Sequence, residues 1–254
     1  MLPQRIANAC YKVAEQFVPY ADVAICGEHF RVPLRWRKWW FQAHESDTME
    51  FVRSYCKPGM VFVDIGAHFG IYSITAARRV APSGKVVSFE PCWRTREILR
   101  RFIAANEVAN VELREEAICH TSGTTNFFTS DIPGDPANTL APFEGHPNQV
   151  TIRTLRLDDL ELSRCDLLKI DAEGAENRIF QGATAFLRTH RPAIFLSVHP
   201  KQIRSSGESL RELWDSFTSL GFIAYERQHA VTSEWFQGHD DWFEVVLIPP
   251  NQLR

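Results

Sequence analysis

The stretch VFVDIGAHFGIYS at residues 61–73 has the residue types of a small-ligand site. An apolar run ends near Asp64, a turn with Gly66 and Gly70 follows, and a helical pattern then begins. Glycines in such a turn let backbone approach a ligand closely, and a helix N-terminus offers free N–H groups to an anion. A carboxylate beside this turn suits a ligand that also carries an ammonium group. The pattern therefore predicts that the turn binds an amino-acid moiety.

A dinucleotide site is not predicted here, because the spacing is D-x-G-x-x-x-G and not G-x-G-x-x-G. Glu90 ends the next predicted strand, where an acidic side chain accepts hydrogen bonds from ribose hydroxyls. An amino acid together with a ribose indicates S-adenosylmethionine as cofactor, with Glu116 and Ala117 near its adenine. The residues that we predict to bind it are Asp64, Gly66, Ala67, His68, Gly70, Glu90, Glu116, Ala117 and Asp171.

A second group of polar residues follows two later strands. KIDAEGAE places Asp171 at a strand end and Glu173 two residues on, and His199 ends a further strand. Methyl transfer to a hydroxyl requires a base within reach of the hydroxyl, or a metal that acidifies it. We therefore predict Asp171, Glu173 and His199 as the catalytic candidates. Glu176 is more simply interpreted as an acid in the first turn of a helix.

These catalytic candidates are also residue types that bind divalent metals. Two carboxylates and a histidine at one sheet edge could hold magnesium or manganese. The same side chains could instead contact only the hydroxyls of a substrate. A divalent metal is thus compatible with the sequence but not favoured, and no metal ligand is assigned.

Strand and helix patterns alternate through most of the chain, which predicts an α/β fold with a mostly parallel sheet and helices on both faces. Each candidate above follows a predicted strand, so the parallel strands should bring the candidates to one edge. The last two strands should form an antiparallel edge. The seven predicted strands cover residues 60–65, 85–90, 110–113, 166–171, 193–198, 222–226 and 242–248.

Several motifs resemble the FkbM family of S-adenosylmethionine-dependent methyltransferases, over roughly residues 45–248. The motifs are VFVDIGAHFGIYS at 61–73, VVSFEP at 86–91, TLRLDDL at 154–160, LLKIDAEGAE at 167–176 and QGA at 181–183. The resemblance implies the class I, Rossmann-like methyltransferase fold, with a seven-stranded sheet and an antiparallel last strand. It also implies methylation of hydroxyl groups, often on sugars or natural products.

By this resemblance, Asp64, Gly66, Gly70 and Glu90 would hold the cofactor. The chain departs from the family pattern at two places. His68 stands where members often carry Asn, and residues 197–199 (SVH) stand where many have an acid near the end of the fifth strand. The second departure affects what the resemblance implies about the acceptor and about the use of a metal.

We predict two parts in the chain: an N-terminal helical and aromatic cap segment at 1–55 and the methyltransferase domain at 56–254. The cap contains an amphipathic pattern at 4–18 and the sequence RVPLRWRKWW at 31–40. The sequence at 31–40 could stack on sugars or form a homodimer contact. It could also bind a membrane interface or a phosphate-bearing lipid carrier, or simply pack on the core. The proline-rich loop at 131–150 should cover the acceptor together with the cap.

The composition of the chain argues against some classes of function. The 254 residues include 28 basic and 31 acidic side chains, a balance that argues against nucleic-acid binding. No apolar run has the length of a membrane span, and the six cysteines form no C-x-x-C pair, which indicates a cytoplasmic setting. We expect an O-methyltransferase with a saccharide, glycosylated or natural-product acceptor. The alternatives are a nicotinamide oxidoreductase, a methyltransferase for nucleic acid or nitrogen, and a noncatalytic cofactor-binding module.

Overall fold

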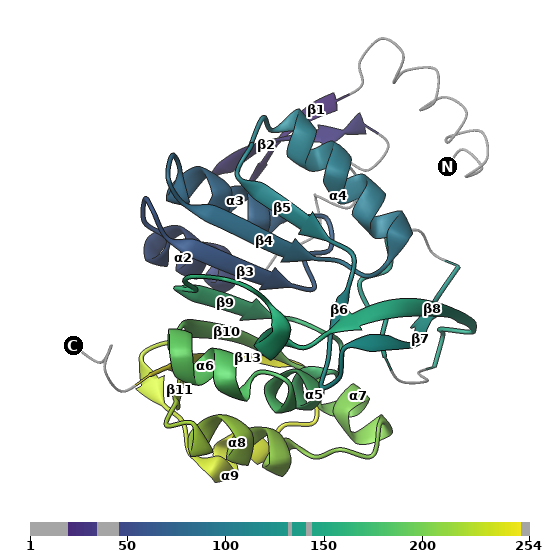
Figure 1. Ribbon diagram of the computed structural model, residues 1–254, viewed down its shortest axis with the longest axis vertical. Helices are drawn as coiled ribbons and strands as arrows, with labels where there is room; N and C mark the ends of the chain where they lie inside the picture. The colour runs from purple at the N-terminus through teal and green to yellow at the C-terminus, as the bar shows by residue number, and fades with distance from the viewer. Residues whose placement is uncertain (1–19, 35–45, 132–133, 141–143, 250–254) are drawn as a thin grey trace.

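The computed structural model describes residues 20–34, 46–131, 134–140 and 144–249. Its centre is an eight-stranded sheet with the order β12-β11-β13-β10-β9-β3-β4-β5 (Figure 1). Among these strands, β3, β4, β5, β9 and β10 pair in parallel, while β13 is antiparallel to both β10 and β11. The strands are β3 Val61–Ile65, β4 Lys85–Phe89, β5 Val111–Arg114, β9 Leu167–Ile170, β10 Ala193–Val198, β11 Ile223–Glu226, β12 His229–Ala230 and β13 Phe243–Ile248.

This sheet confirms the predicted α/β class, the seven expected strands and the antiparallel last strand. The additional strand, β12, has two residues and pairs with β11 at the edge of the sheet. The central strands β9 and β10 are buried along their whole length. Parallel strands covered on both faces read as nearly continuous apolar runs, and this is why the sequence predicted them well.

Helices cover both faces of the sheet (Figure 1). One face carries α2 Ser46–Tyr55, α3 Ile71–Val80 and α4 Trp93–Ala105, and the other carries α5 Glu176–Gln181, α6 Thr184–His190, α8 Leu210–Ser219 and α9 Ser233–Gln237. Side chains alternate between the two cores along each strand, so that Phe62 packs on the α3 face while Val63 and Ile65 pack on the α5 face. The short helix α7, Pro200–Ser205, directly follows β10.

A second, smaller sheet lies beyond the carboxyl ends of β3 and β4 (Figure 1). It has the order β6-β8-β7, with β6 Ala117–Ile118, β7 Gly123–Thr129 and β8 Asn148–Leu155. The predicted loop at 131–150 is the connection between β7 and β8 and includes the first residues of β8. A short 3-10 helix, Leu157–Asp159, then leads to β9.

The N-terminal hairpin packs away from the carboxyl ends of the central strands. It consists of β1 Tyr20–Ile25 and β2 Glu28–Pro33. Phe30 contacts Phe102 of α4, and the backbone N–H of Arg31 donates to Asn106, which follows the C-terminus of α4. Because α4 starts at the carboxyl end of β4 and runs back, its C-terminus lies at the opposite end of the sheet. The described part of the predicted cap therefore does not cover the binding edge.

The other predictions for the N-terminal segment have mixed outcomes. The helix expected from Ser46 is present as α2 and belongs to the layer on the α3 face. The pattern at 4–18 and residues 35–40 of the tryptophan-rich stretch lie outside the described residues. The division into 1–55 and 56–254 stays a prediction. In the parts of the chain that the structure describes, no helix combines the length and hydrophobicity needed to cross a bilayer.

Candidate active site

A cavity of about 270 Å³ lies at the carboxyl ends of β3, β4 and β9. Seven of the nine predicted cofactor residues line it, namely Gly66, Ala67, His68, Glu90, Glu116, Ala117 and Asp171. Glu173, a catalytic candidate, lines it as well. Asp64 and Gly70 do not. The sheet edge thus brings most of the predicted site together, as expected for a ligand crevice outside the strand ends.

The glycine turn after β3 is shaped by contacts with its neighbours in the protein. Gly66 has φ +75°, and a Cβ there would lie 1.8 Å from the carbonyl oxygen of Asp171. Gly70 precedes α3 with φ +84°, and a Cβ there would lie 2.1 Å from Cδ1 of Leu99. Gly70 is therefore a packing residue between α3 and α4, and its predicted contact with the cofactor does not fit this position. Gly66 both allows the close approach of the Asp171 carbonyl and lines the cavity.

Asp64 also differs from its predicted role as the ammonium ligand. Its side chain is fully buried, because alternate residues of β3 face α3, and it accepts a hydrogen bond of 2.6 Å from Ser73 Oγ. Lys169 Nζ lies 3.5 Å from Asp64 Oδ1 and 3.1 Å from Asp171 Oδ2, and it donates to the carbonyl of Gly66. Lys169, rather than a ligand ammonium, is thus the cation beside Asp64.

Lys169 is the residue that sequence reasoning missed most clearly. It is 1% exposed, it lines the cavity, and it connects Asp64 beneath the site to Asp171 at its wall. Burying a charge is costly unless it is paired, so a lysine inside an apolar strand needs acidic partners. The signal was therefore present in the sequence as the one charged residue in the run LLKI.

Glu90 is held in place by two backbone donors. Its Oε2 accepts from the N–H of His68 and its Oε1 from the N–H of Cys92, both at 2.9 Å. Burial raises the pKa of Glu90 to about 7, although these two hydrogen bonds favour the charged form. The carboxylate therefore has a fixed orientation at the cavity wall, as the predicted contact with a ribose diol requires.

The segment after β5 and the loop between β7 and β8 also line the cavity. Arg114 hydrogen-bonds Glu116 at 2.9 Å and lowers the pKa of that carboxyl. On the loop, the carbonyl of Gly134 contacts His68 Nε2 at 2.9 Å, and Thr139 donates to the carbonyl of Glu173. The described part of this loop is thus attached to both the glycine turn and the segment after β9. Asp135, Pro136, Asn138 and Leu140 of the loop line the cavity. The sequence had singled out the loop as a whole but none of these residues individually.

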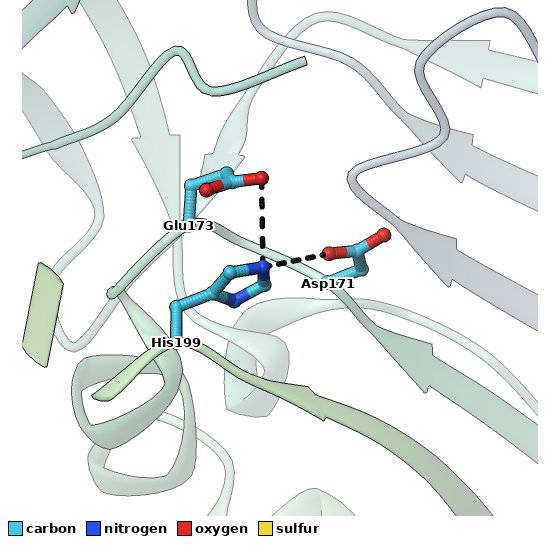
Figure 2. A group of neighbouring side chains, drawn as sticks. All are labelled: Asp171, Glu173 and His199. Atoms are coloured by element: carbon cyan, nitrogen blue, oxygen red, sulfur yellow. Dashed lines mark ion pairs between the residues drawn. The ribbon is translucent and has the colours of Figure 1, made fainter. Parts of the chain in front are cut away.

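The three catalytic candidates meet at the ends of β9 and β10 (Figure 2). His199 Nε2 lies 3.6 Å from Asp171 Oδ1 and 3.5 Å from Glu173 Oε1. The other ring nitrogen, Nδ1, hydrogen-bonds Glu176 Oε1 at 2.7 Å. Glu173 Oε2 accepts from Gln202 of α7 at 3.0 Å. The prediction that Asp171, Glu173 and His199 share one edge therefore agrees with the geometry, while their catalytic roles stay predictions.

Burial and charge perturb all three groups. Burial raises the pKa of Glu173 to about 7 against the opposing effect of His199. Burial disfavours the charged form of His199, but the hydrogen bond and charge of Glu176, together with Glu173 and Asp171, raise its pKa to about 10. For Asp171, the Lys169 and His199 cations outweigh burial and lower the pKa. Asp171 and Glu173 line the cavity and His199 lies beside them, and such perturbed groups next to a cavity are typical of a functional site.

Glu176 has a larger role than a helix-start acid. It is the first residue of α5, but its side chain is fully buried and accepts from the ring of His199 and from the N–H of Gly174. Only the tertiary contact with His199, the residue after β10, distinguishes Glu176 from an ordinary N-terminal acid.

Comparison with known proteins identifies the family. Residues 64–224, more than half of the chain, match the methyltransferase FkbM domain. The chain belongs to the FkbM methyltransferase family. The matched region includes the glycine turn, Glu90 and the KIDAEGAE segment, so the motifs that suggested the resemblance lie inside it except for residues 61–63.

Two characterised relatives align with this FkbM chain. Methyltransferase sdnD of Sordaria araneosa is 26% identical over an alignment of 186 residues, and the match covers 59% of this chain and 71% of that protein. AMB antimetabolite synthetase AmbE of Pseudomonas aeruginosa is 28% identical over an alignment of 212 residues, and the match covers 68% of this chain but only 10% of the synthetase.

Among solved structures, a putative rRNA-methylase from Clostridium thermocellum superimposes with a TM-score of 0.51. The two proteins share 8% sequence identity, and the match covers 80% of this chain and 93% of that one. At this identity the likeness shows the class I methyltransferase fold alone and says nothing of the acceptor.

Proposed function

We propose that this FkbM-family protein is an S-adenosylmethionine-dependent O-methyltransferase. Its acceptor is a hydroxyl of a saccharide, a glycosylated metabolite or another natural product. The observation that carries the proposal is the single cavity that joins the glycine turn and Glu90 to Asp171 and Glu173. It thus has groups suited to the cofactor on one side and perturbed acid–base groups on the other.

The residues at the cavity fit the proposed cofactor. The turn at 66–68 offers backbone groups to the amino-acid moiety, and Gly66 leaves no side chain in the way. Glu90 is oriented to accept from the ribose hydroxyls. Glu116 and Ala117 lie at the wall where the adenine is expected. Asp171 contributes from the β9 side, whereas Asp64 acts indirectly by holding Lys169.

S-adenosylmethionine supplies a methyl group activated on a sulfonium. In the reaction, the bond between the methyl carbon and sulfur breaks, a bond from the acceptor oxygen forms, and the hydroxyl proton must leave. The protein contributes by holding the reacting atoms in line, since positioning alone can supply several kcal/mol of a barrier. Asp171, Glu173 and His199 are the groups available to promote loss of the proton, and the negative charge of the two carboxylates suits an acceptor hydroxyl rather than an anionic acceptor.

The test is transfer of a labelled methyl group. The purified protein is incubated with S-adenosylmethionine that carries a trideuteromethyl group and with a panel of sugars, glycosides and hydroxylated natural products. Mass spectrometry should find the label on a hydroxyl oxygen, and Glu90→Ala should reduce transfer at low cofactor concentration. Labelling only of a nitrogen or of RNA would contradict the proposed acceptor class. Tight cofactor binding without transfer to any acceptor would instead support a noncatalytic module.

The cytoplasmic setting and the homodimer predicted from the sequence remain proposals of the same kind. Size-exclusion chromatography with light scattering tests directly whether the protein is a homodimer.

A further inference from the structure

Three metal-binding side chains of different types converge beside the cavity. One ligand atom from each of Asp171, Glu173 and His199 lies within 4.8 Å of the other two (Figure 2). An ion with bonds of about 2.1 Å holds adjacent ligand atoms about 3 Å apart. The observed distances of 3.5 and 3.6 Å from His199 Nε2 to the two carboxylates therefore require only small side-chain movements.

The imidazole of His199 is oriented as in a metal ligand. Its side chain is 7% exposed, and Nδ1 is committed to Glu176 Oε1 at 2.7 Å. Nε2 points between the carboxylates of Asp171 and Glu173, at distances longer than a hydrogen bond. Metal-binding histidines usually donate their second ring N–H to a carboxylate, which fixes the tautomer and the ring plane. Glu176, itself fully buried, occupies that position here.

The carboxylates around this ring carry more negative charge than a protonated histidine compensates. Three carboxylates surround the imidazole, from Asp171, Glu173 and Glu176. Lys169, which pairs with Asp171, is shared between this residue and the buried Asp64. One imidazolium compensates a single carboxylate, whereas a divalent cation compensates two. Buried charge is costly when it is uncompensated, so a cation would stabilise this arrangement.

We propose that Asp171, Glu173 and His199 bind one divalent cation of the Mg²⁺ or Mn²⁺ type, and that Glu176 positions the imidazole for it. This inference deepens the proposed function and rests on it for the catalytic role. Two carboxylate oxygens and one ring nitrogen are a suitable ligand set for such an ion. Three protein ligands leave coordination positions open for the acceptor on the side of the cavity, which Asp171 and Glu173 line.

The cation would act on the acceptor hydroxyl. A metal-bound oxygen loses its proton more readily, so the hydroxyl proton passes to water. The oxygen then forms its bond to the methyl carbon while the carbon–sulfur bond breaks and its electron pair stays on sulfur. In this arrangement His199 is a ligand and does not take up the proton.

Direct titration of the full chain with Mn²⁺, without cofactor or acceptor, tests the site. Isothermal calorimetry should show one ion bound per chain, displaced by excess Mg²⁺. Asp171→Asn and Glu173→Gln each remove one ligand charge and should weaken binding by at least about tenfold, and Glu176→Gln by about 10- to 100-fold. Asp215→Asn and Glu97→Gln, which change exposed carboxylates on α8 and α4, should bind Mn²⁺ like the wild type. Circular dichroism establishes whether each variant is folded. If Asp171→Asn does not fold, the binding of Mn²⁺ by Glu173→Gln is the test.

Two results would overturn the proposal: no saturable binding of Mn²⁺ by the wild type, or unchanged binding in the folded Glu173→Gln variant. Because this titration requires neither cofactor nor turnover, its result is independent of the O-methyltransferase assignment. Methyl transfer that continues undiminished in excess chelator would overturn the catalytic role of the cation while leaving the proposed function intact.

Discussion

At the scale of single residues, the site depends on carboxylates whose environments differ although they lie at one sheet edge. Glu90 is held by two backbone N–H groups, Asp171 by Lys169, and Glu173 by Gln202 and the ring of His199. These environments support the different tasks that we propose for the same carboxylate group: hydrogen bonding to a diol for Glu90, and charge for Asp171 and Glu173.

The raised pKa of Glu90 predicts that the affinity for the cofactor depends on pH. Its raised pKa of about 7 means that the carboxyl is mostly protonated below this pH and ionised above it. The ionised form is the better acceptor for a diol, so affinity for S-adenosylhomocysteine should rise with pH through about 7 and then level off. Glu90→Gln should weaken binding by about tenfold at high pH and remove most of the pH dependence. Calorimetry between about pH 6 and about pH 8 measures both effects. An unchanged pH profile in the variant would show that another group is responsible.

At the scale of elements, the glycine turn and the helix after it form a unit that is sensitive to one added methyl group. Gly70 places the start of α3 directly against Leu99, which is fully buried in α4. The position of the turn, and with it the backbone at 66–68, depends on this contact between the two helices. We therefore expect a substitution at Gly70, outside the cavity, to change the shape of the cavity.

Gly70→Ala should therefore destabilise the protein by about 1–3 kcal/mol, through backbone strain and overpacking. Gly207→Ala is a matched control, because Gly207 has φ +81° but nothing within 4 Å of a Cβ. Both variants have the strain of a left-handed residue, and only Gly70→Ala adds the contact with Leu99. Denaturant unfolding of the two variants gives the difference. Equal losses of stability would refute the packing role of Gly70.

At the scale of the whole molecule, the N-terminal hairpin and the central sheet share a hydrophobic core. Val23, Ile25, Phe30 and Val32 of the hairpin belong to the same cluster as Ile74 of α3. Arg78 of α3 also hydrogen-bonds the carbonyl of His29 at 2.7 Å. The hairpin therefore contributes to the stability of the fold on the side remote from the cavity.

Phe30→Ala tests this contribution. Phe30 is 1% exposed and packs on Phe102, so its truncation should lower the free energy of unfolding by about 3–5 kcal/mol within a single cooperative transition. Val150→Ala, at a side chain that is 40% exposed, should change it by less than about 0.5 kcal/mol. If residues 20–33 instead formed an independent cap, Phe30→Ala would leave the main thermal transition where it is in the wild type.

The sequence by itself determined the α/β class, the seven main strands and the edge at which the candidate residues meet. Strand patterns and strand-end residues such as Glu90 and Asp171 are local features, and parallel strands necessarily bring their carboxyl ends together. Only the tertiary structure decided that Asp64 points to Ser73 and Lys169, that Gly70 packs on Leu99, and that Glu176 holds His199. These outcomes depend on which face of a strand a helix covers and on contacts between residues distant in the chain, and no local pattern encodes either of them.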